Sequence, residues 1–411
     1  MNMTFRELLE KYKDGTLSEE EKILVEQELE KSEAINDYLA DELEKSIGLK
    51  NLNHVEHEKF SENKTKNNDD LSKQIKKTVN IRLASMVGVS VACMIAIVLI
   101  MQYIISPFVA SQYYNPTKRS SGQKYFQDVN YDIKAITTVS MPGYGVSGIS
   151  VAEDLGSGEY NIIFSRRNLF TNEKETINAK IDRNMRVGTF EMFYPRIYTA
   201  FSEFWNHEEG TTEYEKSLNL KRMSTERDVE HIKELPSTSY ISAWVRFPQD
   251  LNMKELYVSM ERFNKVDFKW IAIRTAKLQG QQLMGFSTGT NDSSDIEALE
   301  EYPGFNLVDT MMLVQSKDPY EEAMAERYKM HFASLLKYLT DRKEAVTALV
   351  GNTDNYKYED ALRYVEENGM STYGALVYGE ADDLMELYES GAIITLDIDN
   401  VVASKYINNI Y

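Results

Sequence analysis

The stretch LASMVGVSVACMIAIVLIMQYII, residues 83–105, decides how the chain is organised. Its 23 residues contain no charged side chain, and it begins directly after Arg82 and ends before Ser106 and Pro107. At ~1.5 Å per residue, a helix of this length extends roughly 34 Å, which matches a hydrocarbon core of about 30 Å. We therefore expect a transmembrane helix at residues 83–105.

The alternative interpretation of this stretch is a buried helix in the core of a soluble protein. A helix of that kind usually has a polar stripe along one side. The polar residues here are Ser85, Ser90 and Gln102, and they do not form a stripe at helical spacing. The length and the missing stripe favour the membrane helix.

Basic residues near the two ends predict the orientation of this helix. Four stand shortly before it and two shortly after it: Lys73, Lys76, Lys77 and Arg82, then Lys118 and Arg119. Cytoplasmic flanks of membrane helices are enriched in Lys and Arg. We expect a single-pass protein of the cell membrane, with a cytoplasmic N-terminus and an extracytoplasmic C-terminus.

Small residues recur every four positions in this stretch, at Ala84, Gly88, Ala92 and Ala96. Spacing of four places them on one face of a helix, where a second helix can approach closely. Small residues are also common in membrane helices without any such role. The face is therefore either incidental or a contact for a membrane partner or a homodimer.

The composition excludes several classes of function. The chain has 411 residues, enough for roughly two to four domains. Its net charge of −19 argues against general nucleic-acid binding, which needs clustered basic residues, and suits a basic protein partner. The one cysteine, Cys93, lies in the apolar stretch, so neither a disulfide within the chain nor a cysteine zinc site is expected.

Residues 1–45 are expected to form three short helices in the cytoplasm. Ser18 and Glu21 fit a capping box at the start of the second helix. The apolar positions at helical spacing are Phe5, Leu8, Leu9 and Tyr12, then Leu24 and Leu29, then Ile35 and Leu39. Two interpretations stay open: a self-sufficient bundle with a solvated acidic face, or an acidic docking module whose apolar side chains need a partner for burial.

Residues 46–82 read as a polar linker followed by the basic juxtamembrane segment. His54 and His57 lie in the linker, and two histidines without a third ligand are more often solvated than bound to metal.

The part after the membrane helix falls into two predicted segments. Residues 106–234 are expected to be β-rich, with strands at 131–141, 160–170 and 175–185. The run GYGVSG at 143–148 fits a dinucleotide-binding pattern, but strand residues follow it instead of a helix, so we interpret it as a glycine-rich turn. An aromatic cluster at Tyr198, Phe201, Phe204 and Trp205 has helical spacing.

Residues 235–411 alternate strands and helices. Two βαβ units are predicted, one from TSYISAWVRF to VDFKWIAIRT and one from YGALVYG to AIITLDIDNVV. A long helix lies between them, with Asp318 as its expected N-cap and Pro319 as its first residue. This pattern favours an α+β fold with a ferredoxin-like sandwich.

Catalytic patterns are missing from the sequence. It contains no nucleophile elbow, no HExxH and no P-loop. His331 falls within the long helix, where a structural histidine with satisfied hydrogen bonds is the expected role. We predict a protein that is not an enzyme and uses no cofactor.

Several stretches resemble one known family. They are FRELLEKYKDGTLSEEE at the N-terminus, Tyr113-Tyr114-Asn115-Pro116 after the membrane helix, ISAWVRFPQDLNMKELY, the strand of Trp270, GFSTG at 285–289 and YGALVYGEADDLMELYES. The chain resembles the membrane-bound anti-sigma factors of Gram-positive bacteria, the sigma factor regulator family, most closely its sigma-M type. The likeness spans nearly the whole chain.

The resemblance implies a function. The cytoplasmic helices would hold an extracytoplasmic-function sigma factor away from RNA polymerase, and the outer part would regulate its release in cell-envelope stress. Many relatives carry an HxxxCxxC zinc motif in the cytoplasmic part, and this chain has no cysteine there and no histidine before His54. The sigma-binding surface would then consist of the apolar positions of residues 1–45 and of acidic side chains.

Two other functions stay open. The chain could be a membrane-anchored extracytoplasmic enzyme or binding protein whose short tail has no regulatory role. It could also be a structural or assembly factor that acts through the outer sandwich.

Overall fold

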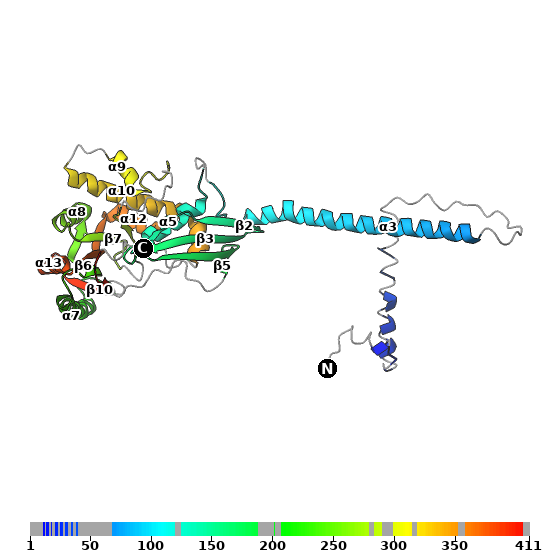
Figure 1. The fold of residues 1–411 in the computed structure, drawn as a ribbon, viewed down its shortest axis with the longest axis horizontal. Helices are drawn as coiled ribbons and strands as arrows, with labels where there is room; N and C mark the ends of the chain where they lie inside the picture. The colour runs from blue at the N-terminus through cyan, green and yellow to red at the C-terminus, as the bar shows by residue number, and fades with distance from the viewer. Residues whose placement is uncertain are drawn as a thin grey trace. The chain divides into compact units, whose positions relative to one another are not determined.

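The computed structural model divides the chain into two compact units, Met1–Gly88 and Val89–Tyr411. The structure describes residues 11–12, 14–15, 18, 21–23, 25–27, 29–31, 34–35, 38–39, 68–119, 125–187, 201, 207–278, 283–289, 299–314, 319–351 and 358–405. The fold is mixed α+β, with two antiparallel sheets and one long apolar helix (Figure 1).

The N-terminal unit is helical at most of its described positions before residue 40. The predicted capping box is confirmed at Ser18. Its backbone N–H donates to Glu21 Oε2 over 3.1 Å, and the Glu21 N–H donates to Ser18 Oγ over 3.4 Å. The hydrogen bonds satisfy backbone donors that the first helical turn leaves without partners.

The long apolar helix consists of three consecutive elements: α3 (Asn68–Ile100), the π-helical turn η1 (Met101–Ile105) and α4 (Ser106–Ala110). Within the described residues, the segment Asn80–Ala110 is the one helix long and apolar enough to cross a membrane. The predicted span at residues 83–105 lies inside it.

The helix does not stop at Pro107, where the sequence had placed the end of the apolar run. Proline lacks an N–H group, and its ring crowds the carbonyl one turn earlier. The wider turn η1 directly precedes it, and the Ser106 N–H bonds to the oxygen of Met101, five residues back. A π turn of this kind allows a helix to continue through a local disturbance.

One predicted strand is wrong. Residues 131–141 belong to the helix α5 (Asp128–Ser140), which packs against α10, α11, β1 and β8. The β-branched run from Ile136 to Val139 suggested a strand. Val129, Ile133 and Ile136 also have helical spacing, and burial of nearly the whole helix outweighs the strand propensity.

The first sheet is antiparallel and contains β1 (Tyr144–Val146), β2 (Val151–Gly156), β3 (Glu159–Asn168), β4 (Lys174–Asp182) and β5 (Met185–Val187). β3 pairs with β4 on one side and with both β1 and β2 on the other. The predicted strands at 160–170 and 175–185 are confirmed as β3 and β4. The glycine run 143–148 is a turn with positive φ at Gly143 and Gly148 around β1, as expected.

The second sheet contains β6 (Tyr240–Asn252), β7 (Asp267–Ile273), β8 (Gly285–Ser287), β9 (Ser371–Glu380) and β10 (Thr395–Val402). Its order is β10-β6-β9-β7-β8, and every neighbouring pair is antiparallel. The helices α8 (Met253–Arg262) and α13 (Ala381–Glu389) connect β6 to β7 and β9 to β10.

This order separates the two strands of each predicted βαβ unit by one strand of the other unit. β6 and β7 both run antiparallel to β9 and are therefore parallel to each other, and β9 and β10 are related in the same way through β6. This is the split βαβ connectivity of ferredoxin-like sheets.

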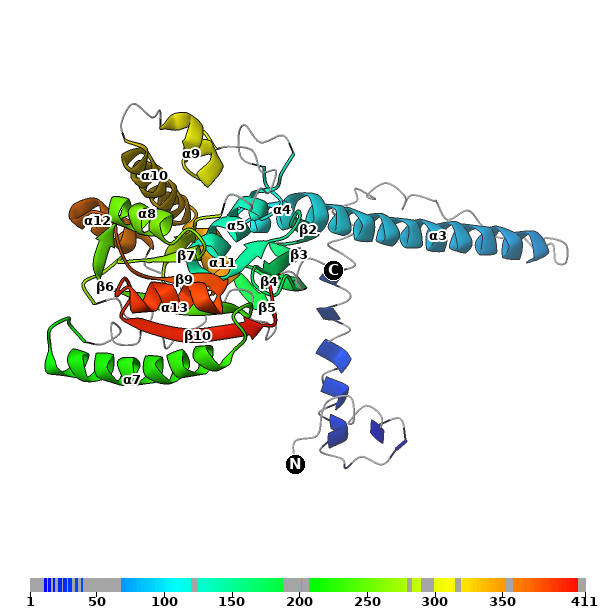
Figure 2. The same ribbon diagram turned by 60° about the vertical axis from the view of Figure 1, so that its left-hand side comes forward.

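The remaining helices cover the second sheet on both sides. They are α7 (Thr212–Glu234), α9 (Leu307–Leu313), α10 (Tyr320–Asp341), α11 (Lys343–Val350) and α12 (Tyr358–Asn368). α7 lies on one side, and α8 and α10 lie on the other (Figure 2). α10 is the predicted long helix, but it begins one residue later than predicted. Pro319 has the extended ψ of 140° and is the N-cap, and Asp318 lies outside the described residues.

Two buried clusters hold these layers together. The larger one includes side chains of α5, both sheets and α8 to α13, and so draws on both predicted outer segments. The smaller one is aromatic and joins Trp244 and Trp270 of the second sheet to Phe201 and Tyr214. Of the predicted aromatic cluster, only Phe201 is described, and it is buried.

Candidate interaction sites

The predicted sigma-binding residues lie in the N-terminal unit, and the structure describes four of the eight. Leu29, Ile35 and Leu39 are 41%, 59% and 56% exposed, and Tyr12 is half-buried with its hydroxyl 3.1 Å from Glu26 Oε1. The other four, Phe5, Leu8, Leu9 and Leu24, lie outside the described residues. Exposed apolar side chains on helical residues provide a surface on which a partner can gain burial.

The predicted membrane-partner residues lie on α3. Ala84, Gly88, Ala92 and Ala96 are all exposed, and a Cβ added at Gly88 would meet no atom within 4 Å. No described part of the chain covers this face. Its role as a contact for a second helix stays a prediction.

A third site, which the sequence did not predict, lies where the long helix joins the outer region. Asp132 of α5 is 1% exposed and accepts hydrogen bonds from three side chains that come from different elements. The Tyr114 hydroxyl donates to Oδ2 over 2.7 Å and the Tyr338 hydroxyl to Oδ1 over 2.8 Å. Arg342 donates to both oxygens, from Nε and Nη2, each over 2.9 Å. We call Tyr114, Asp132, Tyr338 and Arg342 the junction cluster.

The electrostatics of the junction cluster keep its groups in fixed protonation states. Burial and the nearby Asp132 carboxylate raise the pKa values of the Tyr114 and Tyr338 hydroxyls well above 10. Burial lowers the pKa of the Arg342 guanidinium, but the charge and hydrogen bonds of Asp132 outweigh it and raise the pKa above its ordinary value. Arg342 therefore stays charged and the tyrosines stay protonated over the whole physiological range.

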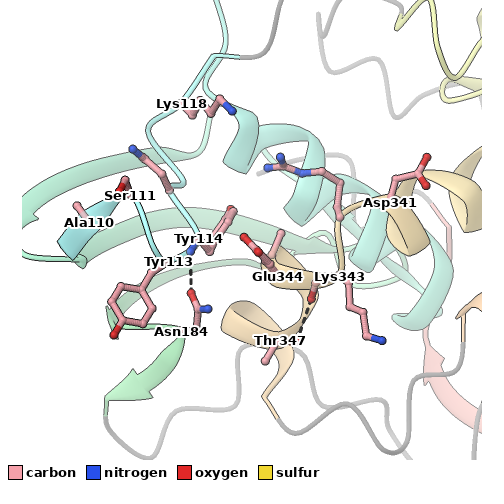
Figure 3. A pocket seen from close by; sticks show the side chains of 13 residues that line it. Ala110, Ser111, Tyr113, Tyr114, Lys118, Asn184, Asp341, Lys343, Glu344 and Thr347 are labelled. Carbon is pink, nitrogen blue, oxygen red and sulfur yellow. Dashed lines mark hydrogen bonds between the residues drawn. The ribbon is translucent and has the colours of Figure 1, made fainter. Parts of the chain in front are cut away.

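Two β-turns also contact the C-terminal end of the long helix and the residues after it. The Ser157 N–H of the β2–β3 turn donates to Ser106 Oγ over 2.7 Å, and the Tyr114 N–H donates to Asn184 Oδ1 over 2.8 Å. Figure 3 shows Asn184 facing the backbone of Tyr114. Gly158 allows Tyr113 to pack on the β2–β3 turn, since an added Cβ would lie 3.0 Å from the tyrosine ring. These contacts fix α4 and the residues after it to the β2–β3 and β4–β5 turns.

A half-open cavity of about 810 Å³ lies beside the junction cluster. Its walls come from the end of α4 and the residues after it, from the β4–β5 turn and from the corner between α10 and α11 (Figure 3). The charged lining residues are Lys118, Asp341, Arg342, Lys343 and Glu344. Both signs of charge are present, and Arg342 is engaged by Asp132, so this lining shows no marked preference for an anion or a cation.

The histidines and carboxylates of the described ranges form no metal site, and one buried histidine has a structural role. No group of three or more His, Cys, Asp or Glu side chains there is placed to hold a metal ion. His331 is buried, with Nδ1 2.8 Å from the oxygen of Gly304, as predicted for a structural histidine. Burial lowers its pKa to about 4, so the ring is neutral near pH 7.

Sequence reasoning missed the junction cluster because it placed α5 among the strands. Asp128 and Asp132 are four residues apart, and on a helix they share a face with the apolar Val129 and Ile136. A carboxylate on an apolar face predicts a buried partner. The partner Arg342 is 210 residues further along the chain, and no local pattern connects the two.

Comparisons with known proteins show what the chain is similar to. Residues 232–400 match the sigma factor regulator C-terminal family. The probable anti-sigma-M factor YhdL of Bacillus subtilis (strain 168) is 22% identical over 414 residues, which cover 98% of this chain and 98% of the relative. No solved structure matches the chain. These findings confirm the resemblance seen in the sequence: the chain carries the C-terminal region of the sigma factor regulator family at residues 232–400.

Proposed function

We propose that the chain is a single-pass membrane anti-sigma factor. Residues 1–45 bind an extracytoplasmic-function sigma factor in the cytoplasm, residues 46–82 connect them to the span, and the outer segments 106–234 and 235–411 regulate release. The observation that carries the proposal is the similarity over 98% of the length to a probable anti-sigma-M factor. The apolar helix Asn80–Ala110 and the family match at residues 232–400 support it.

The exposed apolar side chains of the N-terminal unit support a docking role for residues 1–45. Burying one leucine or isoleucine side chain contributes about 1.5–3 kcal/mol. Together, Leu29, Ile35 and Leu39 offer enough apolar surface to stabilise a complex. The acidic balance of the segment suits a basic surface on the sigma factor.

The orientation in this proposal rests on the basic residues before the span. Lys77 and Arg82 lie on the N-terminal side, and Lys118 and Arg119 on the other. Membrane-impermeant thiol labelling of intact cells tests it. With Cys93 changed to alanine, a cysteine at Lys31 should be protected and a cysteine at Leu220 should be labelled.

The junction cluster supports a route from the outer region to the span. Asp132, Tyr338 and Arg342 belong to α5, α10 and the corner before α11, and Tyr114 stands four residues after the last helical residue Ala110. A rearrangement among these elements therefore moves the end of the membrane helix. Loss of the cluster should change the activity of the sigma factor without any change in residues 1–45.

The experiment that tests the proposal is deletion of residues 1–45 in the full-length protein in its own cell. We expect derepressed transcription from sigma-dependent promoters and loss of the sigma factor from material purified through the outer region. Unchanged transcription with a normal amount of membrane-inserted protein would contradict the proposal.

Point variants make the test sharper. Ile35→Asp and Leu39→Asp place a charge on the predicted face, and Ile23→Asp places the same charge on an exposed isoleucine outside it. We expect the first two to weaken sigma factor binding at least about tenfold, since a buried charge without a partner costs more than 1.4 kcal/mol, and Ile23→Asp to have the smaller effect.

A second candidate function is a membrane-anchored extracytoplasmic binding protein. The cavity of about 810 Å³ beside the junction cluster favours it, because its size lies in the range of small-molecule sites. This candidate predicts that deletion of residues 1–45 leaves transcription unchanged, so the deletion separates the two functions.

A further inference from the structure

The edge of the first sheet next to the long helix carries exposed apolar side chains at its turns. Leu155 at the end of β2 is 49% exposed, and Met185 at the start of β5 is 68% exposed. The ends of β2, β3 and β5 lie on the side of the outer region where the helix enters (Figure 1). We call Leu155, Ser157, Asn184 and Met185 the membrane-side edge.

Hydrogen bonds fix the depth of this edge relative to the helix. Ser157 donates its N–H to Ser106 Oγ over 2.7 Å, and Asn184 accepts from the Tyr114 N–H over 2.8 Å. The two turns are also joined to each other, because the Arg183 N–H donates to the oxygen of Gly158 over 3.0 Å. Ser157 thus lies at the level of Ser106, and the β4–β5 turn that ends at Met185 is joined to the same turn.

Ser106 is the first residue after the apolar run. The 23 uncharged residues extend roughly 34 Å at ~1.5 Å per residue. The hydrocarbon core is about 30 Å thick, with about 5–8 Å of headgroup region on each side. A group at the level of Ser106 therefore lies within the headgroup region. Exposed Phe108 and half-buried Tyr113 near this level are aromatic residues typical of that region.

We propose that the membrane-side edge rests on the bilayer, with Leu155 and Met185 inserted among the lipid headgroups next to the span. The partner is the lipid surface itself. The nearby charges favour a contact that does not depend on anionic lipid, because Lys180 is 2.6 Å from Glu159 and Arg183 is 3.8 Å from Asp182. The interaction is then mainly burial of apolar side chains.

The inference rests on residues 83–105 spanning the membrane, which belongs to the proposed function. It does not depend on the orientation of the span or on a sigma factor. The consequence is that the outer region cannot tilt freely on the membrane surface, since one edge is held by lipid and the junction cluster holds the helix.

The test uses the full-length protein in phosphatidylcholine vesicles, with an environment-sensitive fluorophore on single cysteines. Leu155→Cys and Met185→Cys are made in a Cys93→Ala background. Leu220→Cys is the matched control, since Leu220 is 68% exposed on α7, which packs against β10 and α13. The native Cys93, labelled in the unchanged chain, reports on the span.

We expect the probes at 155 and 185 to show blue-shifted emission and about twofold loss of intensity to lipids that carry a spin label at headgroup depth. The probe at 220 should show neither effect. Adding phosphatidylglycerol should leave the result unchanged. Probes at 155 and 185 that behave like the probe at 220, or that respond only in anionic vesicles, would overturn the proposal.

The Cys93 probe separates the two possible failures. If deep spin labels quench the Cys93 probe but the probes at 155 and 185 are not quenched, residues 83–105 span the membrane and the proposed contact of the membrane-side edge with lipid is wrong. If Cys93 itself is not quenched in the vesicles, the span is wrong and the proposed function fails with it.

Discussion

The N-terminal unit and the outer region use apolar residues in opposite ways. In the outer region, most aromatic residues of the second sheet lie in closed cores, and Trp244, Trp270 and Phe286 are at most 3% exposed. In the N-terminal unit, Leu29, Ile35 and Leu39 are exposed on helical residues. The outer region is stable through its own contacts, whereas the N-terminal unit leaves these three apolar side chains open to solvent.

Under the proposed function, the difference separates a sensor from a docking segment. A sensor has to keep its shape while its surroundings change, which requires buried, mutually supporting contacts. A docking segment has to gain stability on binding, which requires contacts left open in the free state. The variants that follow test whether the outer region carries the stability of the protein and the N-terminal unit carries the binding of a partner.

The largest effect is expected for Asp132→Ala. The substitution removes the nearer of the two carboxylate partners of Arg342, with Asp128 remaining at 3.4 Å, and leaves two buried hydroxyls without their acceptor. The free energy of unfolding should therefore fall by about 3–5 kcal/mol. Denaturant unfolding followed by tryptophan fluorescence measures it, and Glu366→Ala on the exposed face of α12 is the control. Equal stability of the two variants would show that the junction cluster is not structural.

A smaller effect is expected from the protonation of His331. The unfolded state binds the proton near pH 6.5 and the folded state only near pH 4, so the unfolded state carries more protons between these values. The contribution of His331 to the free energy of unfolding should therefore be complete above pH 6.5 and fall by about 3 kcal/mol as the pH drops to 4. Carboxylates also contribute to the change of the free energy of unfolding with pH in this range. The measurement is therefore the difference between the native protein and His331→Gln, which should lose the contribution of His331.

Tyr114→Phe removes one hydrogen bond to Asp132 and keeps the ring. Asp132 retains three donor contacts, so the free energy of unfolding should fall by only about 1.5–2 kcal/mol. If the cluster transmits the state of the outer region, sigma-dependent transcription should change more than stability does. Tyr113→Phe is the matched control, and a transcriptional change equal in both variants would contradict a specific role of Tyr114.

The smallest effect on stability is expected in the N-terminal unit. Ile35→Ala and Leu39→Ala remove exposed side chains, so the unfolding of the outer region should change by less than about 0.5 kcal/mol. Binding of the sigma factor should weaken in the same variants, as measured by co-purification. A large loss of stability would show that the two units are not separate in their energetics.

The sequence predicted those elements whose periodicity agrees with their burial. β6, β7, β9 and β10 form at the predicted positions, with β6 and β9 buried on both faces. The inner face of α10 is buried at all the predicted positions: Met324, Tyr328, Phe332, Leu335, Leu336 and Leu339. The split arrangement of the βαβ units follows from pairing between distant strands, which local periodicity does not contain.

The failures have a different physical origin. α5 is buried on nearly every side, so its burial gives no amphipathic stripe and its β-branched residues misled the prediction. The junction cluster brings together residues separated by up to 228 positions, from Tyr114 to Arg342, and only the folded chain makes them neighbours. The apolar positions of residues 1–45 can be read from the sequence as a pattern, and their role in binding a partner stays a prediction.

The π turn before Pro107 has a rotational consequence. Each residue of an α-helix turns the chain by about 100°, and a π turn contains roughly one residue more than an α turn. The direction in which Ala92 and Ala96 point is therefore offset from that of an uninterrupted helix anchored at Tyr114. The π turn thus sets the rotational direction in which this part of the apolar helix faces, relative to Tyr114.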